Sequence, residues 1–234
     1  MKTLLIPNKT LFTKKRYGRK TDGGYIFLSE LCDKANTVYA YGVGDDTSCD
    51  DDLAKESKKI YLFDPTISED SPCLNERNEN GGYLNGIKNK NFVFTKEPFS
   101  KDFASHVKRN NDEWQNDMIL KVDAEGAEWD GFLNCESLIF KCFSQMSIEF
   151  HHVTDGDETQ KAVFKKILKY YYIHHMHGNN WSPINNGIPE TLEISFVRKD
   201  YVGEVKTDNN MYPINGLDFP NCPYRADDQL NWWL

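Results

Sequence analysis

Short hydrophobic runs alternate along the chain with longer segments in which apolar residues recur at helical spacing. Short apolar runs are typical of buried strands, and amphipathic segments of this length are typical of connecting helices. The runs predict strands at Thr37–Val43, Ile60–Asp64, Phe92–Thr95, Met118–Asp123, Met146–Phe150, Tyr171–His175 and Leu192–Arg198. The intervening segments predict helices at Ser48–Ser57, Ser100–Asn110, Ala127–Ile139 and Asp157–Tyr170.

This alternation predicts an α/β fold with a Rossmann-like, mainly parallel sheet flanked by helices. The last two strands follow each other without a helix between them, which predicts an antiparallel hairpin at one edge. We expect a single domain over residues 1–234. It comprises an N-terminal cap segment (1–36), a core (37–200) with a polar insertion (66–91), and a C-terminal substrate-side tail (201–234). The long loops are expected around the carboxyl ends of the strands, where such sheets bind ligands.

Composition narrows the classes of protein to consider. The chain has 28 basic and 36 acidic residues and a formal net charge of −8, which disfavours a nucleic-acid binder held by phosphate contacts. Apolar runs are far shorter than a membrane span needs, and the three-residue run near the start is too short for a secretory signal. Six cysteines without a C-x-x-C pair predict reduced thiols and a cytoplasmic protein. The sequence leaves a homo-oligomer open.

The first candidate site is a glycine turn, Tyr41–Ser48, which leaves a strand and enters a helix. Two glycines let the backbone approach a ligand, and the helix start offers free N–H groups. Thr47 occupies the place of the third glycine of a dinucleotide fingerprint, so that match is incomplete. Ser48 is the predicted N-cap, and the aspartates at 50–52 are expected to complement the helix dipole. A loop with this many aspartates repels the pyrophosphate of NAD(P) but tolerates the positively charged sulfonium of S-adenosylmethionine. The loop therefore favours S-adenosylmethionine over NAD(P) as the cofactor.

Two further strand ends carry acidic residues. Asp64 follows the second strand, twenty residues beyond Gly44, where an acid can accept both hydrogen bonds from a ribose diol. The segment Leu120–Trp129 runs from a buried strand into three acids and a glycine. Asp123 and Glu125 lie at the mouth of the predicted sheet, whereas Glu128 is expected to do no more than other acids in a first helical turn.

At this point the sequence resembles a known family. The run K-V-D-A-E-G-A-E-W at residues 121–129 is similar to the K-x-D-x-E-G-x-E signature of FkbM-type S-adenosylmethionine-dependent methyltransferases. Five other segments resemble elements of the family in the same order. Residues 16–25 resemble its amino-terminal R-x-G-x(3)-D-G-G-Y element, residues 41–46 its glycine turn and residues 63–66 its ribose-contacting strand end. Residues 147–151 resemble the strand after the signature, and residues 175–180 resemble its H-x-H-x-N-N element. The resemblance spans residues 16–198. One departure is Cys49-Asp50, where the family commonly has Phe-Glu.

The resemblance implies a class I methyltransferase fold, S-adenosylmethionine as cofactor and a small acceptor. It implies cofactor contacts at Gly42, Gly44, Asp45, Ser48, Asp64, Pro65 and Asp123. The implied acceptor contacts are Asp22, Tyr25, His175, His177, Asn179 and Asn180. His175 and His177 share one face of a strand, which suggests recognition of acceptor hydroxyls rather than a place in the core, and a purely structural role is the alternative.

Two chemistries use the same strand ends. In the first, which we prefer, a histidine takes the proton of an acceptor hydroxyl while Asp123 and Glu125 assist. His151 is the first candidate for this base and His152 the second, while His106 is expected at the surface of a helix. In the second, Asp123 and Glu125, with Glu149 or a histidine, bind magnesium or manganese, which lowers the pKa of a substrate diol.

The expected activity is therefore O-methylation. Family tendency favours a carbohydrate hydroxyl, in particular a nucleotide- or lipid-linked sugar destined for a surface polysaccharide. The alternatives are a secondary metabolite methylated with the help of a divalent metal, and an NAD(P)-dependent reductase that uses the same glycine turn. From a different class, a non-catalytic nucleoside-binding module also fits the sequence.

Overall fold

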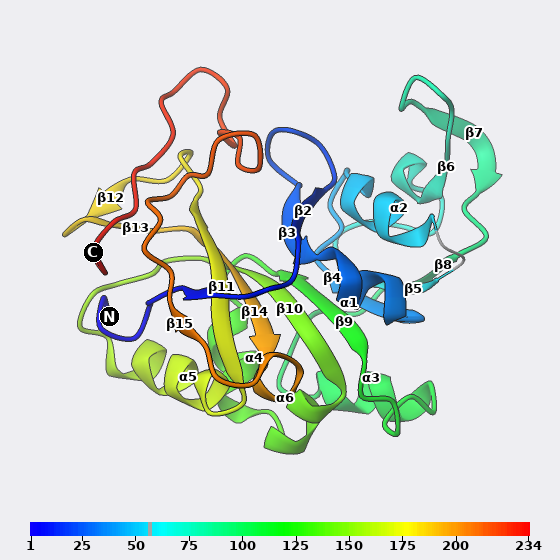
Figure 1. Ribbon diagram of the computed structural model, residues 1–234. Coiled ribbons are helices and arrows are strands. Elements are labelled where there is room, and N and C mark those ends of the chain that lie inside the picture. The colour runs from blue at the N-terminus through cyan, green and yellow to red at the C-terminus, as the bar shows by residue number, and fades with distance from the viewer. Residues whose placement is uncertain (56–57) are drawn as a thin grey trace.

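The structure is a computed structural model that describes residues 1–55 and 58–234. The last two residues of the predicted helix Ser48–Ser57 lie outside the described residues. A seven-stranded sheet forms the centre of the molecule, with the strand order β11-β14-β10-β9-β4-β5-β8 (Figure 1). Its strands are β4 (Thr37–Tyr41), β5 (Lys59–Phe63), β8 (Phe92–Thr95), β9 (Met118–Asp123), β10 (Phe143–Phe150), β11 (Tyr171–Gly178) and β14 (Leu192–Arg198).

Strand direction confirms the predicted fold class. The pairs β8–β5, β5–β4, β4–β9 and β9–β10 are parallel, and β14 runs antiparallel to both of its neighbours, β10 and β11. The last two predicted strands thus form the expected antiparallel pair, with β11 at the edge. A mainly parallel sheet in this order, with helices on both faces, is a Rossmann-like α/β fold.

Side chains alternate between the two faces of the sheet, as the strand geometry requires. Tyr39 and Tyr41 pack with helices α3 (Phe103–Arg109), α4 (Glu128–Asn134) and α5 (Glu158–Leu168). Val38 and Ala40 point to the opposite face and pack with α2 (Ser48–Ala54) and the N-terminal segment. Both faces are therefore buried, and the central strands are hydrophobic throughout.

The N-terminal segment covers part of the second face. It contains β1 (Asn8–Lys9), β2 (Lys14–Tyr17), β3 (Tyr25–Leu28) and α1 (Ser29–Lys34), and β2 pairs with β3 as a hairpin. The backbone of β3 is tied to the sheet by side chains of β10 and β14. The N–H of Leu28 donates to Gln145 at 2.8 Å, and the hydroxyl of Ser195 donates to the carbonyl of Ile26 at 2.7 Å.

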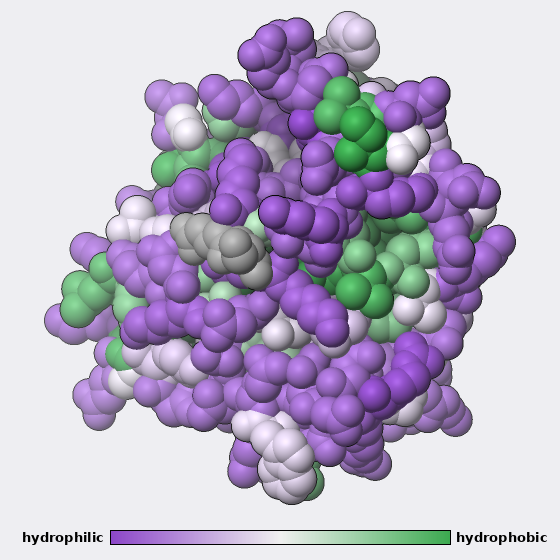
Figure 2. Space-filling model, turned by 90° about the vertical axis from the view of Figure 1, so that its right-hand side faces the viewer, coloured by the Kyte–Doolittle hydropathy of each residue, from purple (hydrophilic) through white to green (hydrophobic). Residues whose placement is uncertain are grey.

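The polar insertion folds as a short 3₁₀ turn, η1 (Pro72–Leu74), and a hairpin of β6 (Asn75–Arg77) and β7 (Tyr83–Lys88), which the sequence pattern did not predict. Arg77 fastens this hairpin, because its guanidinium donates to Asp51 at 2.6 Å and to Asp46 at 2.8 Å. Figure 2 views this side of the molecule, where the surface is mostly hydrophilic and hydrophobic atoms gather in small separate patches.

Several predicted boundaries shift. The predicted helix Ala127–Ile139 is two elements, α4 and the 3₁₀ helix η2 (Ser137–Lys141), because the backbone is extended at Cys135. Strand β10 begins three residues earlier than predicted, and β11 continues to Gly178. The expectation that His106 lies at the surface is wrong. Its ring is buried, stacks on Phe63 with centroids 4.6 Å apart, and lies 3.0 Å from the hydroxyl of Tyr41.

The C-terminal tail returns across the sheet edge near β11 (Figure 1). It includes α6 (Lys199–Val202) and β15 (Lys206–Thr207), which pairs with β1, and a bridge joins Tyr212 to Leu230. A small hairpin of β12 (Ile184–Asn185) and β13 (Ile188–Pro189) lies beside it. All six cysteines fall in the described residues, where they are buried and form no disulfide. No helix of the described chain has the length and apolar character needed to cross a bilayer.

Candidate functional site

The glycine turn lies where β4 meets the end of β9. Gly42 has φ +75°, and a Cβ there would lie 1.5 Å from the carbonyl oxygen of Asp123, so only glycine fits. Gly44 also has a left-handed φ of +57°, but a Cβ there would meet no described atom within 4 Å. The ammonium of Lys121 donates to the carbonyl of Gly42 at 2.9 Å. The backbone is thus held closely against Asp123 and Lys121 at Gly42, whereas there is free space beside Gly44.

Asp64 shapes this turn. One of its carboxylate oxygens accepts from the N–H groups of Val43 and Gly44, both at 2.8 Å, and the other accepts from the N–H and hydroxyl of Thr66, both at 2.6 Å. Burial raises the pKa of Asp64, but these hydrogen bonds outweigh it and hold the pKa below its ordinary value. Four donors occupy the roughly four lone-pair positions of a carboxylate. The geometry therefore does not support the expected grip on both hydroxyls of a ribose.

Ser48 does not take the place expected for it. Thr47 precedes helix α2, so Ser48 is inside the first turn rather than its N-cap. Its hydroxyl donates to Asp46 at 2.7 Å and accepts from the backbone N–H of Arg19 at 3.1 Å. Ser48 lines a separate hollow between α2 and the β6–β7 hairpin. Its predicted contact with the cofactor is therefore corrected to a role in fixing the loop.

The aspartates of α2 also do more than complement its dipole. Asp50 is fully buried, and burial raises its pKa to about 6 against the opposing effect of Lys121. Asp51 accepts from Arg77, and Asp52 accepts from the backbone N–H of Gly18 at 2.8 Å. Asp51 thus joins the helix to the insertion, and Asp52 joins it to the N-terminal segment.

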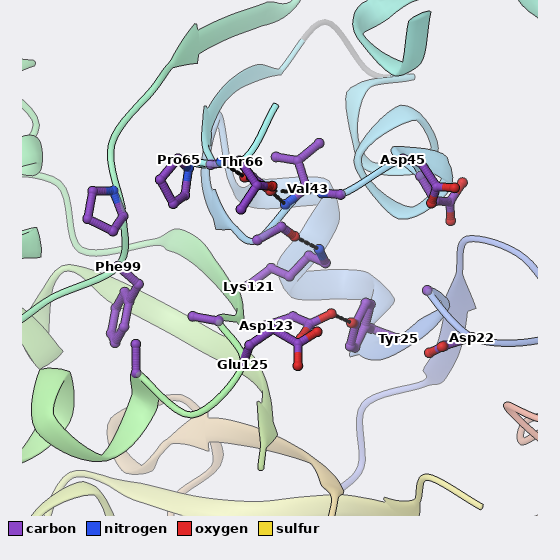
Figure 3. A pocket seen from close by; sticks show the side chains of 18 of the residues that line it. Asp22, Tyr25, Val43, Asp45, Pro65, Thr66, Phe99, Lys121, Asp123 and Glu125 are labelled. Atoms are coloured by element: carbon purple, nitrogen blue, oxygen red, sulfur yellow. Dashed lines mark hydrogen bonds between the residues drawn. The ribbon is translucent and has the colours of Figure 1, made fainter. Parts of the chain in front are cut away.

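A cavity of about 400 Å³ opens at the carboxyl ends of β4, β5 and β9 (Figure 3). This volume is within the range of small-molecule sites. Predicted residues on its wall are Asp22, Tyr25, Gly42, Gly44, Asp45, Asp64, Pro65, Asp123 and Glu125. The cavity is also lined by residues that were not predicted as site residues, namely Arg19, Thr66, Pro98, Phe99 and Lys121. Phe99 and Pro65 lie on one side of the view, Asp123 and Glu125 lie together near its middle, and Asp22 lies beyond Tyr25 on the opposite side.

Glu128 holds the loop after β9, which corrects the expectation that it has no special role. Its two fully buried oxygens accept from the N–H groups of Ala124 at 2.7 Å and Gly126 at 2.9 Å. Within this loop Glu125 has a left-handed φ of +52°, which is strained for a residue with a side chain. The loop holds the largely exposed carboxylate of Glu125 beside the cavity.

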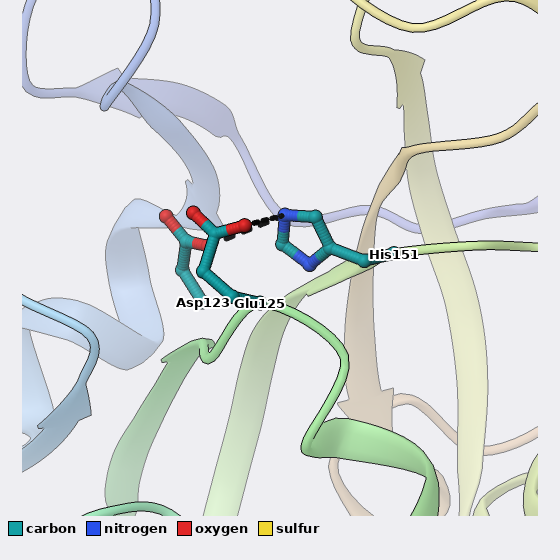
Figure 4. A group of neighbouring side chains, drawn as sticks. All are labelled: Asp123, Glu125 and His151. Atoms are coloured by element: carbon teal, nitrogen blue, oxygen red, sulfur yellow. Dashed lines mark ion pairs between the residues drawn. The ribbon is translucent and has the colours of Figure 1, made fainter.

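His151, at the end of β10, is surrounded by carboxylates. Its Nε2 atom lies 3.5 Å from Glu125 and 3.8 Å from Asp123, and its Nδ1 atom lies 3.4 Å from Glu128 (Figure 4). Burial lowers the pKa of His151, but the carboxylates, Glu128 foremost, outweigh burial and raise it above the ordinary value. The indole of Trp129 donates to the carbonyl of His151 at 2.7 Å and fixes this strand end.

His152 is placed differently from its neighbour. It is exposed and has a left-handed φ of +56°. Its carbonyl accepts from the side chain of Gln160 at 2.7 Å, and its ring lies beside Gly126. The three-residue group of Asp123, Glu125 and His151 does not include it, so the geometry favours His151 as the base.

Tyr25 connects the cavity to a buried acid. Its hydroxyl lies 2.9 Å from Asp123 and 3.2 Å from Glu149. A hydroxyl has one proton, so it can donate to only one carboxylate at a time. Burial and the nearby charge of Asp123 raise the pKa of Glu149 well above its ordinary value.

The candidate metal ligands fall into two groups rather than one. In the first, ligand atoms of Asp123, Glu125 and His151 all lie within 4.8 Å of one another. Glu149 instead belongs to a second group with Asp22 and Glu193, which meets the same limit. Of the two predicted sets, the structure brings together the one in which a histidine, His151, joins Asp123 and Glu125, rather than the one with Glu149.

The residues of the H-x-H-x-N-N element are buried, so the expectation that they lie outside the core is wrong. His175 lies 2.7 Å from Asp218, and the amide of Asn180 donates to the carbonyls of Cys222, Arg225 and Ala226. These contacts hold the C-terminal tail against β11. The amide of Asn179 donates to Glu149 at 2.8 Å, which places it beside the second acidic group.

His177 bridges two carboxylates, Glu193 at 3.2 Å and Asp227 at 3.0 Å. Burial lowers its pKa, but these acids outweigh burial and raise the pKa to about 10. A histidine whose pKa is raised by folding stabilises the protein fully below its unfolded value of about 6.5, and this stabilisation is lost as pH rises toward 10.

We therefore expect the free energy of unfolding, measured with urea, to fall by on the order of 2–4 kcal/mol between pH 6.5 and 10. In His177→Gln the slope over this range should be smaller, although the variant is less stable at neutral pH. His152→Gln, at an exposed site, is the matched control. Equal slopes in wild type and His177→Gln would contradict the assignment.

No protein-family model matches this sequence, and no curated protein matches it. Among solved structures, the chain is similar to an rRNA methylase from Streptococcus thermophilus. That alignment has a TM-score of 0.41 and 14% sequence identity, and it covers 72% of this chain and 93% of the methylase. The order and directions of the seven strands by themselves identify a Rossmann-like α/β fold.

Proposed function

We propose that this protein is an S-adenosylmethionine-dependent O-methyltransferase of the FkbM type that acts on a hydroxyl of a small acceptor. The observation that carries the proposal is the cavity at the ends of β4, β5 and β9. It combines a backbone turn at Gly42 and Gly44 with an apolar end and an acidic end.

The cavity fits the cofactor by the chemistry of its walls. Phe99 and Pro65 offer apolar surface to an adenine ring, while the open turn at Gly44 and the carboxylate of Asp45 suit the cationic methionine part. Asp64 contributes by shaping the turn. Bound here, S-adenosylmethionine supplies an electrophilic methyl group on a sulfonium sulfur.

The chain's own residues have three tasks in this proposal. The loop held by Glu128 and the network of Tyr25 and Asp123 position the acceptor, since alignment of the reacting groups is worth on the order of 7–11 kcal/mol. His151 takes the proton of the acceptor hydroxyl at its Nε2 atom, which faces Asp123 and Glu125. Those carboxylates stabilise the imidazolium that results.

For the acceptor we propose a carbohydrate, in particular a nucleotide- or lipid-linked sugar. Asp22, Tyr25 and Glu125 present polar oxygens on the cavity wall, which suits a polyhydroxylated ligand. His175 and Asn180 are left out of the acceptor site, because their polar atoms hold the tail. His177 and Asn179 do not contact the acceptor themselves in this proposal. They orient the buried carboxylates of Glu193 and Glu149.

A ligand-binding measurement tests the proposal. We expect S-adenosylmethionine and S-adenosylhomocysteine to stabilise the protein in thermal unfolding, by about 2.7 kcal/mol at 100 times the dissociation constant. NAD and NADP, tested in parallel, should produce no shift, since the acidic turn repels a pyrophosphate. Stabilisation by NAD or NADP alone would overturn the proposal in favour of a reductase.

A metal-assisted form of the same reaction is the second candidate. The observation that favours it is the approach of Asp123, Glu125 and His151, an oxygen and nitrogen set that suits magnesium or manganese. A cation held there would lower the pKa of the acceptor hydroxyl. His151 would then serve as a ligand in its neutral form, not as the base.

A further inference from the structure

A second acidic group lies deeper than the first, between the sheet and the two chain ends. Its carboxylates come from three segments: Asp22 from the loop before β3, Glu149 from β10 and Glu193 from β14. Glu149 and Glu193 are buried, and one oxygen from each of the three residues lies within 4.8 Å of the others. Burying carboxylates this close together is costly unless a cation or protons compensate them.

A buried amide is directed at the same point. Asn221, from the C-terminal tail, is 2% exposed, and its nitrogen donates to Glu193 at 2.6 Å and to Asp22 at 3.0 Å. Its oxygen is buried and has no hydrogen-bond partner among the described residues. A 180° rotation of the terminal amide group exchanges the positions of its oxygen and nitrogen and leaves the rest of the side chain in place. After this rotation the oxygen, which has no described partner in its present position, would point at the carboxylates.

We propose that Asp22, Glu149, Glu193 and Asn221 form a site for a hard divalent cation, Ca²⁺ or Mg²⁺. Three carboxylates and one amide oxygen are the ligands that these ions prefer, with water completing the coordination. Oxygens within 4.8 Å of one another can all reach a single Ca²⁺, whose ligands lie 2.3–2.6 Å from the ion. The amide turns its oxygen to the ion when the ion binds.

The surrounding residues already support such ligands. Asn179 donates to one oxygen of Glu149 at 2.8 Å, and His177 lies 3.2 Å from one oxygen of Glu193. Contacts of this kind fix the orientation of ligating carboxylates. The ion would join the N-terminal segment, the sheet and the tail, and so stabilise the wall of the cavity that Asp22 lines. The site has a different set of ligands from the group formed by Asp123, Glu125 and His151, although it adjoins that group, since Glu149 lies 3.8 Å from His151 and Tyr25 contacts both Asp123 and Glu149.

Calorimetric titration of Ca²⁺ and of Mg²⁺ into the chelator-treated full chain tests the site. We expect saturable binding of at least one ion and a matching rise in Tm. Asp22→Asn, a loop substitution, should weaken this binding at least tenfold, whereas the exposed control Asp70→Asn should not change it. Asn221→Asp adds a negative ligand and should tighten binding, an outcome that general damage to the fold would not produce.

Glu125→Gln separates this site from the first group of ligands. If the proposal holds, Glu125→Gln keeps the binding event that Asp22→Asn weakens. The proposal is overturned if wild type binds neither ion, if Asp22→Asn binds as wild type does, or if only Glu125→Gln loses binding. These outcomes leave the cofactor-binding test untouched, because they are read without S-adenosylmethionine or an acceptor.

Discussion

Replacing Gly42 by alanine should destabilise the protein by on the order of 3–5 kcal/mol and abolish binding of S-adenosylhomocysteine. The methyl group would lie 1.5 Å from the carbonyl oxygen of Asp123, and the left-handed φ of +75° adds strain. Relief requires β4 and the end of β9 to separate, which also displaces Lys121 from the carbonyl of Gly42. Urea unfolding and calorimetric titration measure the two effects.

Gly44→Ala is the matched control. This residue also has a left-handed φ, of +57°, but a Cβ there meets open space in the described structure. We expect a loss of only about 1–2 kcal/mol from backbone strain. A difference between the two variants therefore isolates the collision with Asp123. Equal losses would mean that strain alone matters and that the close approach of the two strand ends does not.

Replacing His151 by alanine should lower kcat by on the order of 10²–10⁴-fold while leaving the affinity for S-adenosylhomocysteine within about twofold. The base must be neutral to accept a proton, so kcat/KM of the wild type should rise with pH and level off above the histidine's pKa. Because neighbouring carboxylates raise that pKa, the plateau should begin above pH 6.5. Steady-state rates measured across pH 5–9 test this rise of kcat/KM and the pH at which it levels off.

Two controls separate the roles of the histidines and of a metal. His152→Ala, at the exposed neighbouring position, should keep nearly full activity. Treatment with a chelator should leave the rate unchanged if His151 is the base. A rate that is lost on chelation and restored by magnesium would show that activity needs a metal, held either by Asp123, Glu125 and His151 or by the deeper group of Asp22, Glu149 and Glu193. A larger loss in His152→Ala than in His151→Ala would contradict the assignment outright.

The sequence determined the core of the fold, because its signals are local. Each apolar run has the length of a strand, four of the seven runs are followed by a helix-forming segment, and these patterns need no knowledge of distant residues. The wall of the cavity was largely predictable for a related reason. Gly42, Asp64 and Asp123 all follow predicted parallel strands, and the carboxyl ends of such strands meet at one edge of the sheet.

The roles of these residues depended on their partners. Asp64 follows the second strand as a ribose-binding acid would, but four donors around the turn occupy its oxygens. Glu128 resembles any acid in a first helical turn, but its buried oxygens hold the loop that carries Glu125. Hydrogen-bond partners are groups that lie close together in the folded protein. The spacing of residues along a strand or helix does not reveal which distant groups these are.

Only the tertiary structure decided what happens to the histidines and to the chain ends. His106 is buried because a long-range contact with Tyr41 gives its ring a partner. His175 and His177 share a strand face, as the pattern predicts, but that face is covered by the tail, where Asp218 and Asp227 meet them more than forty residues along the chain. The sequence by itself determined the sheet and the edge at which ligands bind. The packing of the two chain ends determined which polar groups at that edge stay free to bind ligands. The reason is that a buried polar side chain needs a hydrogen-bond partner, and the chain ends supply partners for some of these groups.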